Sequence, residues 1–248
     1  MQRSTAVSSP LRRNHSAGLL AGFAAVVLLF ATSHAQFSAA QTTATQTSKV
    51  KDASVLHPPA GARVAIVEFA DLECPDCSRA NPVLKEAVAK YHIPWLRHDF
   101  PLPYHPWSTE AAINARWFDA KGKGLGDEYR DQVFANQSSF YYDIAGFRTF
   151  TQKFAQSHGI ALPFAVDPQG KLAAEVKADY ELGQRIGIEH TPTIWVVTSN
   201  SKGAPYIEIT DRSKLYQILD QALADTKTSD TKTSETKHPD TKHSDAKR

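Results

Sequence analysis

The 248-residue chain is close to electrically neutral, with 28 Lys and Arg against 26 Asp and Glu and a formal charge of +2. Its composition, 42% hydrophobic and 22% charged, is typical of a globular protein. This balance excludes a strongly basic surface of the kind that binds nucleic acid, so we expect no nucleic-acid partner.

The first 35 residues have the pattern of a secretory signal peptide. Arg3, Arg12 and Arg13 precede an uncharged apolar run over 17–32, and Ser33-His34-Ala35 supplies the small residues of a cleavage site. The run is shorter than the roughly 20 residues that span a bilayer, which favours cleavage over the alternative, an uncleaved membrane anchor. We therefore expect a periplasmic or otherwise extracytoplasmic protein, in a compartment where disulfides persist.

Low-complexity segments flank one region of domain size. Residues 36–58, rich in Thr, Gln, Ser and Ala, predict a flexible linker. Residues 225–248 repeat a five-residue unit without an apolar face, so we expect a disordered tail. The remaining residues 59–224 have the size of a single domain, and because no dimerisation domain accompanies them we expect a monomer.

The hydrophobic pattern of 59–224 alternates between strands and helices. The apolar run 63–69 predicts a strand buried on both faces, and after it apolar residues recur at helical spacing up to Tyr91, interrupted by Pro82. The elements predicted next are a strand at 94–100, helices at 108–122, 127–136, 143–158 and 167–187, strands at 193–198 and 206–210 joined by a turn at 199–203, and a closing helix after Asp211. This order predicts an α/β, thioredoxin-like fold with a helical domain inserted at about 108–187.

The only two cysteines of the chain are Cys74 and Cys77, separated by Pro75 and Asp76. Such a short spacing closes almost no loop, so the pair is suited to reversible disulfide chemistry rather than to stapling the fold. At the start of a helix, Cys74 faces unpaired amides that stabilise a thiolate, which predicts an exposed attacking sulfur. Cys77, one turn later, would resolve the mixed disulfide, and Pro75 suits the first helical position. The alternative, a zinc site, lacks a second cysteine pair, and we expect no metal and no cofactor.

The segment from Glu68 to Cys77 resembles the active-site segment of bacterial DsbA-like thiol:disulfide oxidoreductases, members of the thioredoxin superfamily. The resemblance covers roughly residues 60–224. Further motifs that carry it are Pro82 in the first helix, Phe100-Pro101-Leu102 with His105, and His190-Thr191-Pro192-Thr193.

The resemblance implies a role for several of these residues. Glu68 matches a buried acid that moves protons to and from the inner cysteine. Thr191 and Pro192 match a cis-proline loop, whose backbone pairs with a bound peptide substrate. His190 is a candidate for tuning the thiolate, with an ordinary surface histidine as the alternative.

Asp76 decides which way we expect the reaction to be poised. A carboxylate between the cysteines opposes a thiolate, so we expect a higher pKa for Cys74 and a less oxidising disulfide than with histidine there. Export nevertheless favours a dithiol oxidase that acts on unfolded or newly exported proteins and is re-oxidised by a membrane redox partner of the DsbB type. A reductase or isomerase, and a peptide-binding or chaperone module, are the alternatives.

Overall fold

The computed structural model describes residues 50–199 and 205–234. The expected signal peptide, most of the linker, the turn after Ser199 and the end of the tail lie outside the described residues. None of the helices in the described part of the chain has the length and hydrophobicity of a membrane span.

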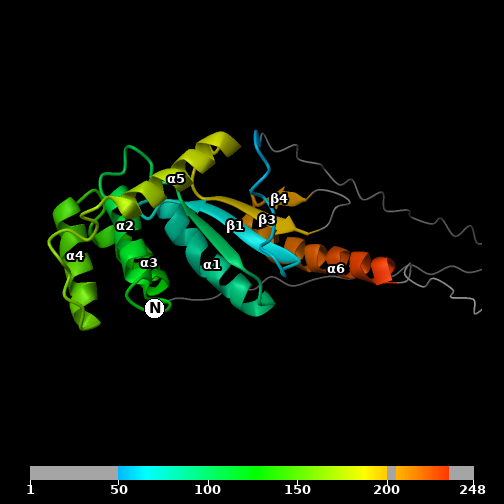
Figure 1. Ribbon diagram of the computed structural model, residues 1–248, viewed down its shortest axis with the longest axis horizontal. Helices are drawn as coiled ribbons and strands as arrows, with labels where there is room; N and C mark the ends of the chain where they lie inside the picture. Colours follow the sequence, from blue (N-terminus) through cyan, green and yellow to red (C-terminus); the bar gives the residue numbers. More distant parts are fainter. Residues whose placement is uncertain (1–49, 200–204, 235–248) are drawn as a thin grey trace, which may run out of the picture. The chain divides into compact units, whose positions relative to one another are not determined.

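A four-stranded sheet with the order β2-β1-β3-β4 forms the centre of the described region (Figure 1). β1 (Val64–Ala70) pairs parallel with β2 (Trp95–Asp99) and antiparallel with β3 (Thr193–Thr198), which pairs in turn with β4 (Tyr206–Glu208). The apolar run expected to form a fully buried strand is β1, because both of its neighbours are strands and helices cover both faces.

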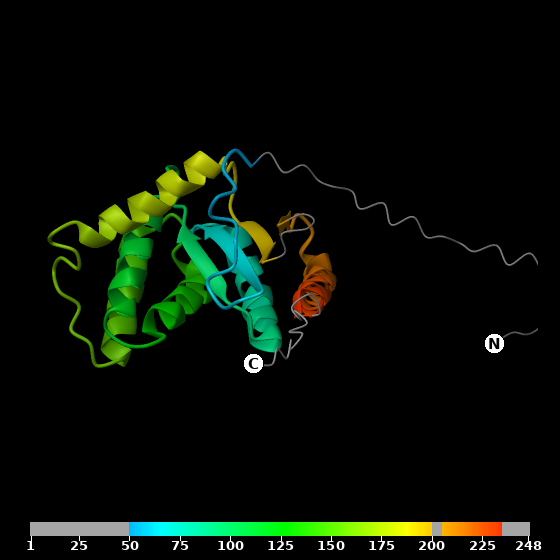
Figure 2. The same ribbon diagram turned by 45° about the vertical axis from the view of Figure 1, so that its right-hand side comes forward.

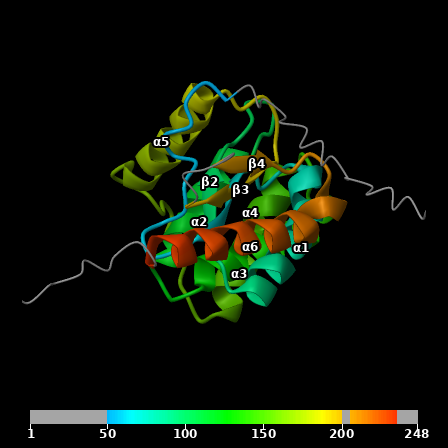
Figure 3. The ribbon, with the colours of Figure 1, turned by 90° about the vertical axis from the view of Figure 1, so that its right-hand side faces the viewer.

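Two helices cover one face of the sheet, and a third covers the other. α1 (Pro75–Tyr91) and α6 (Leu215–Ser234) lie side by side on the first face (Figure 3). Leu84 of α1 and Leu215 and Leu219 of α6 pack there against strand residues. The opposite face packs against α5 (Lys171–Ile186). The redox pair of cysteines begins α1, so the sheet and its helices place it at one end of β1.

The remaining helices form the inserted domain, at the opposite side of the sheet from β4 (Figure 2). They are α2 (Ser108–Asp119), α3 (Leu125–Asn136) and α4 (Ile144–Ser157), with a short 3-10 turn, η1 (Gln137–Ser139). Their core is aromatic and includes Trp107, Phe118, Tyr129, Phe147 and Phe154. Cys74 and Cys77 belong to the same packed cluster, so this core forms one wall of the redox site.

The order of strands and helices agrees with the prediction, and two boundaries differ by four residues or more. α5 begins at Lys171 instead of Asp167, and it ends as predicted at Gly187, whose φ of 96° suits glycine. α6 continues to Ser234, so the expectation of a disordered tail from 225 is wrong for 225–234. Extending a packed helix avoids the unfavourable nucleation step, and Thr226 is still buried, with its hydroxyl donating to the Ala222 carbonyl.

Candidate active site

Cys74 occupies the N-cap of α1, with an extended backbone, and Pro75 takes the first helical position as predicted. The pKa of Cys74 is lowered to about 6, first by a hydrogen bond from the Cys77 thiol, while partial burial opposes this effect. The backbone amides of Cys77 and Asp76 lower the pKa further, because the first turn of a helix leaves such amides without helical partners. These contacts stabilise the thiolate form of Cys74.

The two sulfurs differ in access and in acidity. Cys77 is completely buried, and burial raises its pKa well above the usual value. Cys74 is the more accessible of the two but is only 7% exposed, so the expectation of an exposed sulfur is wrong in degree. The covering groups come from the aromatic core of the insertion and from the loop before β3, which no local pattern around Cys74 reveals.

The loop before β3 lies against Cys74. The Thr191–Pro192 peptide bond is cis, and both residues are buried. In its protonated form, the Cys74 thiol donates to the Thr191 carbonyl oxygen at 3.3 Å, which joins two segments far apart in the chain. His190 is exposed, and its carbonyl accepts from the Thr193 hydroxyl at 2.7 Å. Among the described contacts, the His190 ring forms none with either cysteine.

Glu68 is buried in β1, with 2% of its surface exposed. Burial raises its pKa to about 7, and two neighbours on β2 oppose this shift. Arg97 is its strand-pairing neighbour, and the Trp95 indole Nε1 donates to its Oε2 at 3.0 Å. Its charge is one of the causes that raise the pKa of Cys77. Glu68 can therefore hold or release a proton near neutral pH, close to the inner sulfur.

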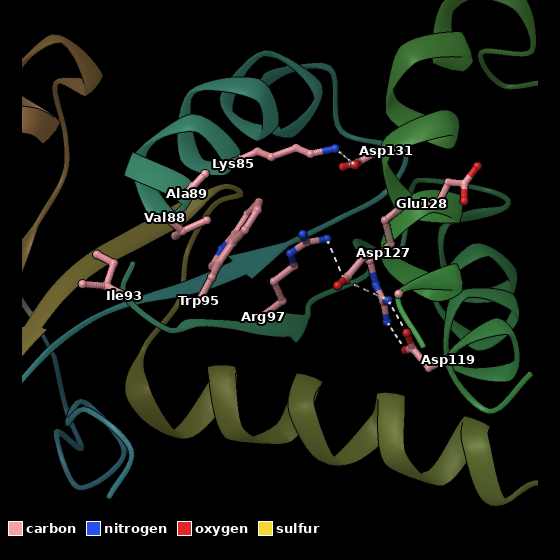
Figure 4. Close-up of a pocket in the computed structure, with 12 residues that line it drawn as sticks. Lys85, Val88, Ala89, Ile93, Trp95, Arg97, Asp119, Asp127, Glu128 and Asp131 are labelled. Carbon is pink, nitrogen blue, oxygen red and sulfur yellow. Dashed lines mark hydrogen bonds and ion pairs between the residues drawn. The ribbon is translucent and has the colours of Figure 1, made fainter. Parts of the chain in front are cut away.

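Trp95 and Arg97 also line a cavity of about 650 Å³ between α1, β2 and α3 (Figure 4). The Arg97 guanidinium stacks over the Trp95 ring at 3.7 Å and lies 3.5 Å from the Asp127 carboxylate. A second ion pair, between Lys85 and Asp131, joins α1 to α3. These contacts connect the insertion to the sheet, on the side from which Trp95 reaches Glu68.

A buried polar network next to the cysteines escaped the sequence analysis. Asp71 accepts hydrogen bonds from the amides of Glu73 and Leu102 and from the His105 ring, each at 2.7 Å, and from the Ser108 hydroxyl. Glu73 is fully buried and accepts from the Trp107 amide at 2.8 Å, while its pKa is raised by burial. The side chain of Glu73, directly before Cys74, therefore points into the inserted helices. Asp71 and Glu73 lie next to the cysteine motif in the sequence, and His105 follows it, which was a signal for a polar site. The sequence did not show that His105 and Asp71 form a hydrogen bond.

Asp76 is paired in a way that the sequence did not indicate. Its carboxylate accepts two hydrogen bonds from Arg212, at 2.7 and 3.1 Å, and one from the Arg79 Nε at 3.2 Å. The Arg212 bonds are the first cause that holds the pKa of Asp76 below its usual value. Two guanidinium groups thus offset the carboxylate that we expected to oppose the Cys74 thiolate. Arg212 lies 136 positions away along the chain, so no local pattern identified it.

Within residues 50–199 and 205–234, no three His, Cys, Asp or Glu side chains converge so as to hold a metal ion.

Comparisons with known proteins agree with this geometry. A family model described as thioredoxin matches residues 59–209, and a comparison with curated proteins finds no match. The chain is similar to the crystal structure of Wolbachia pipientis alpha-DsbA1, with 18% identity and a TM-score of 0.57 over 70% of this chain and 92% of that one. It is also similar to the thiol-disulfide exchange protein alpha-DsbA2 of the same organism (16% identity, TM-score 0.53, 66% and 84%).

A third similar structure is a periplasmic thioredoxin-like protein from Salmonella enterica serovar Typhimurium, with 18% identity and a TM-score of 0.51 over 65% of this chain and 84% of that one. At such identities the likeness concerns the fold, and it confirms the predicted thioredoxin-like architecture with inserted helices. The family match covers the sheet, the cysteine pair and the cis-proline loop. The chain therefore belongs to the thioredoxin family, with the fold of DsbA-type proteins and the paired cysteines of thiol:disulfide exchange.

Proposed function

We propose that the protein is an exported thiol:disulfide oxidoreductase that works as a dithiol oxidase. The observation that carries this proposal is the contrast between the two sulfurs: the pKa of Cys74 is about 6, and that of Cys77 is far above it. A stabilised Cys74 thiolate favours the reduced pair, so the disulfide readily passes to another dithiol.

The reaction follows from the positions of three groups. A substrate thiolate attacks the Cys74 sulfur of the disulfide, and the bond to Cys77 breaks. Because the pKa of Cys77 is high, its leaving sulfur needs a proton, which Glu68 supplies from the buried side. A second substrate thiolate then attacks the substrate sulfur of the mixed disulfide, and Cys74 leaves as a stable thiolate. The substrate has gained a disulfide, and the enzyme holds two electrons as a dithiol.

The surroundings of Cys74 favour an extended polypeptide as substrate. The backbone of Thr191 next to Cys74 suits pairing with an added strand. Exposed tyrosines Tyr104, Tyr141 and Tyr142 offer apolar rings with polar tips, and the charge of Cys74 is among the causes that raise the pKa of Tyr141. Unfolded or newly exported proteins present such segments. We further propose an extracytoplasmic monomer that a membrane redox partner of the DsbB type re-oxidises.

The redox state of the pair in living cells tests the direction of the reaction. Alkylation of free thiols after acid quenching should find Cys74 and Cys77 mostly as a disulfide. A mostly dithiol pair would contradict the oxidase and favour a reductase or isomerase.

Purified protein tests the chemistry itself. Wild type should oxidise a reduced, unfolded protein with glutathione disulfide as the electron acceptor, and Cys74→Ser should lose this activity. Cys77→Ser should accumulate a mixed disulfide through Cys74, because the resolving sulfur is missing. Full activity of Cys74→Ser in preventing aggregation, with no oxidation by wild type, would instead indicate a chaperone.

A further inference from the structure

Arg212 reaches the redox site from a distant segment. It begins the short 3-10 turn η2 (Arg212–Lys214), directly before α6, and its guanidinium makes a two-pronged contact with Asp76 in the first turn of α1. About a third of each side chain is exposed, 32% for Arg212 and 38% for Asp76. The paired, planar geometry holds the guanidinium in one place, which a single ion pair on a flexible side chain would not.

Asp76, Arg79 and Arg212 form a cluster whose net charge is positive. Arg79 contributes a second guanidinium to Asp76, from the next turn of α1. One carboxylate and two guanidinium groups carry a net charge of about +1. Glu73, the other acid beside Cys74, lies buried against the Trp107 amide, with its pKa raised by burial.

The field of Arg212 extends to both sulfurs. The hydrogen bond to Asp76 is the first cause that raises the pKa of Arg212, and the negative charges of Cys77 and Cys74 contribute to the same shift. The interaction is mutual, so the guanidinium stabilises a thiolate at these positions. Asp76 thus has two opposing effects, since its own charge repels the thiolate and its hydrogen bonds hold Arg212 nearby.

We propose that Arg212 is a positioning residue for the redox reaction, which Asp76 anchors beside Cys74 so that the disulfide becomes a stronger oxidant than the Asp76 carboxylate alone would allow. This proposal rests on the thiol:disulfide exchange proposed above and specifies what sets its equilibrium.

The equilibrium with glutathione measures this effect. Two glutathione thiols reduce the Cys74–Cys77 disulfide to two thiols and become glutathione disulfide, with two electrons transferred. Removing Arg212 should raise the pKa of Cys74 by about 0.5–1 unit. The shift is smaller than for a buried charge, because the contact between Arg212 and Asp76 is partly exposed and water screens it. At pH 7, where the pKa of Cys74 starts from about 6, this shift lowers the equilibrium constant for reduction of the disulfide by glutathione about 3- to 5-fold.

A double-mutant cycle distinguishes anchoring from simple charge. Arg212→Ala should lower the equilibrium constant 3- to 5-fold, and adding Asp76→Asn should restore it to within about twofold of wild type, because the uncompensated carboxylate is then gone. Asp76→Asn alone should also stay within about twofold, since it removes a negative charge and releases Arg212. Absorbance of the thiolate at 240 nm, followed against pH, gives the pKa of Cys74 in each variant.

Lys214→Ala is the matched control, because Lys214 belongs to the same turn, is 65% exposed and pairs with Asp211 at 3.7 Å. It should leave the equilibrium constant unchanged. Melting temperatures of all variants verify folding, and Arg212→Gln replaces Arg212→Ala if the latter unfolds.

The proposal is overturned if Arg212→Ala stays within twofold of wild type, or if Asp76→Asn alone raises the equilibrium constant threefold or more. The second result would mean that Asp76 opposes the thiolate in spite of Arg212. These outcomes differ from a failure of the proposed oxidase, because the equilibrium can be measured for any reversible Cys74–Cys77 disulfide, whichever direction the protein serves in cells.

Discussion

Replacing Glu68 by Gln should stabilise the reduced protein above pH 7 and leave its stability near pH 4 unchanged. The substitution keeps the size of the side chain and an oxygen that can accept from the Trp95 indole. It removes the ionisable proton. The variant therefore measures how much the ionised, buried carboxylate of Glu68 lowers the free energy of unfolding.

The magnitude follows from the difference between the two pKa values. Burial raises the pKa of Glu68 from 4.5 to about 7, and each unit corresponds to about 1.4 kcal/mol, which gives about 3 kcal/mol. Between pH 4.5 and 7 the folded state binds more protons than the unfolded state, so the Glu68 contribution to stability falls as pH rises. Above pH 7 the full destabilisation is present in wild type and absent in Glu68→Gln.

Urea unfolding of the reduced proteins at pH 4, 5.5, 7 and 8.5 measures this difference. The gain of Glu68→Gln over wild type should be close to zero at pH 4 and reach about 3 kcal/mol at pH 8.5. The matched control is Glu86→Gln, which removes an exposed carboxylate from α1. A gain that is the same at all four pH values would refute the assignment of a raised pKa to Glu68.

A kinetic measurement tests the proton-transfer role separately from stability. If Glu68 supplies the proton to the leaving Cys77 sulfur, Glu68→Gln should slow the reduction of the disulfide by a small thiol, and general acid–base contributions of this kind are typically about 10²-fold or more. An unchanged rate at pH 7 would leave the stability effect intact and contradict the role in proton transfer.

Trp95→Phe removes the hydrogen bond to Glu68, and because that bond stabilises the carboxylate, we expect a loss of about 1.5–3 kcal/mol at pH 8.5 and less at pH 4 in the same urea titrations. Asp71→Ala leaves several buried donors without their acceptor and should lower stability by about 3 kcal/mol or more; a change below 1 kcal/mol would argue against the network. Gly183→Ala places a methyl group 2.5 Å from the Phe100 ring and should cost about 1–3 kcal/mol, seen as a lower melting temperature.

Much of the architecture was predictable because its cause is local. The unbroken apolar run before the cysteines requires burial on both faces, which a central strand such as β1 provides. Helical spacing and glycine stops located the helices between β2 and β3, as at Gly187, where a positive φ ends α5. The end of α6 was missed because a polar repeat is judged unstable on its own, whereas a helix already packed on the sheet can extend through it.

The sequence by itself determined the reactive groups: two sulfurs at helical spacing, an acid in the preceding strand and a Thr-Pro bond before β3. Only the tertiary structure decided how these groups are poised. Residues separated by many positions meet there, so that the carbonyl of Thr191 covers Cys74 and Arg212 compensates Asp76. Electrostatic effects depend on distances in space and on burial, and neither can be derived from the order of residues around Cys74.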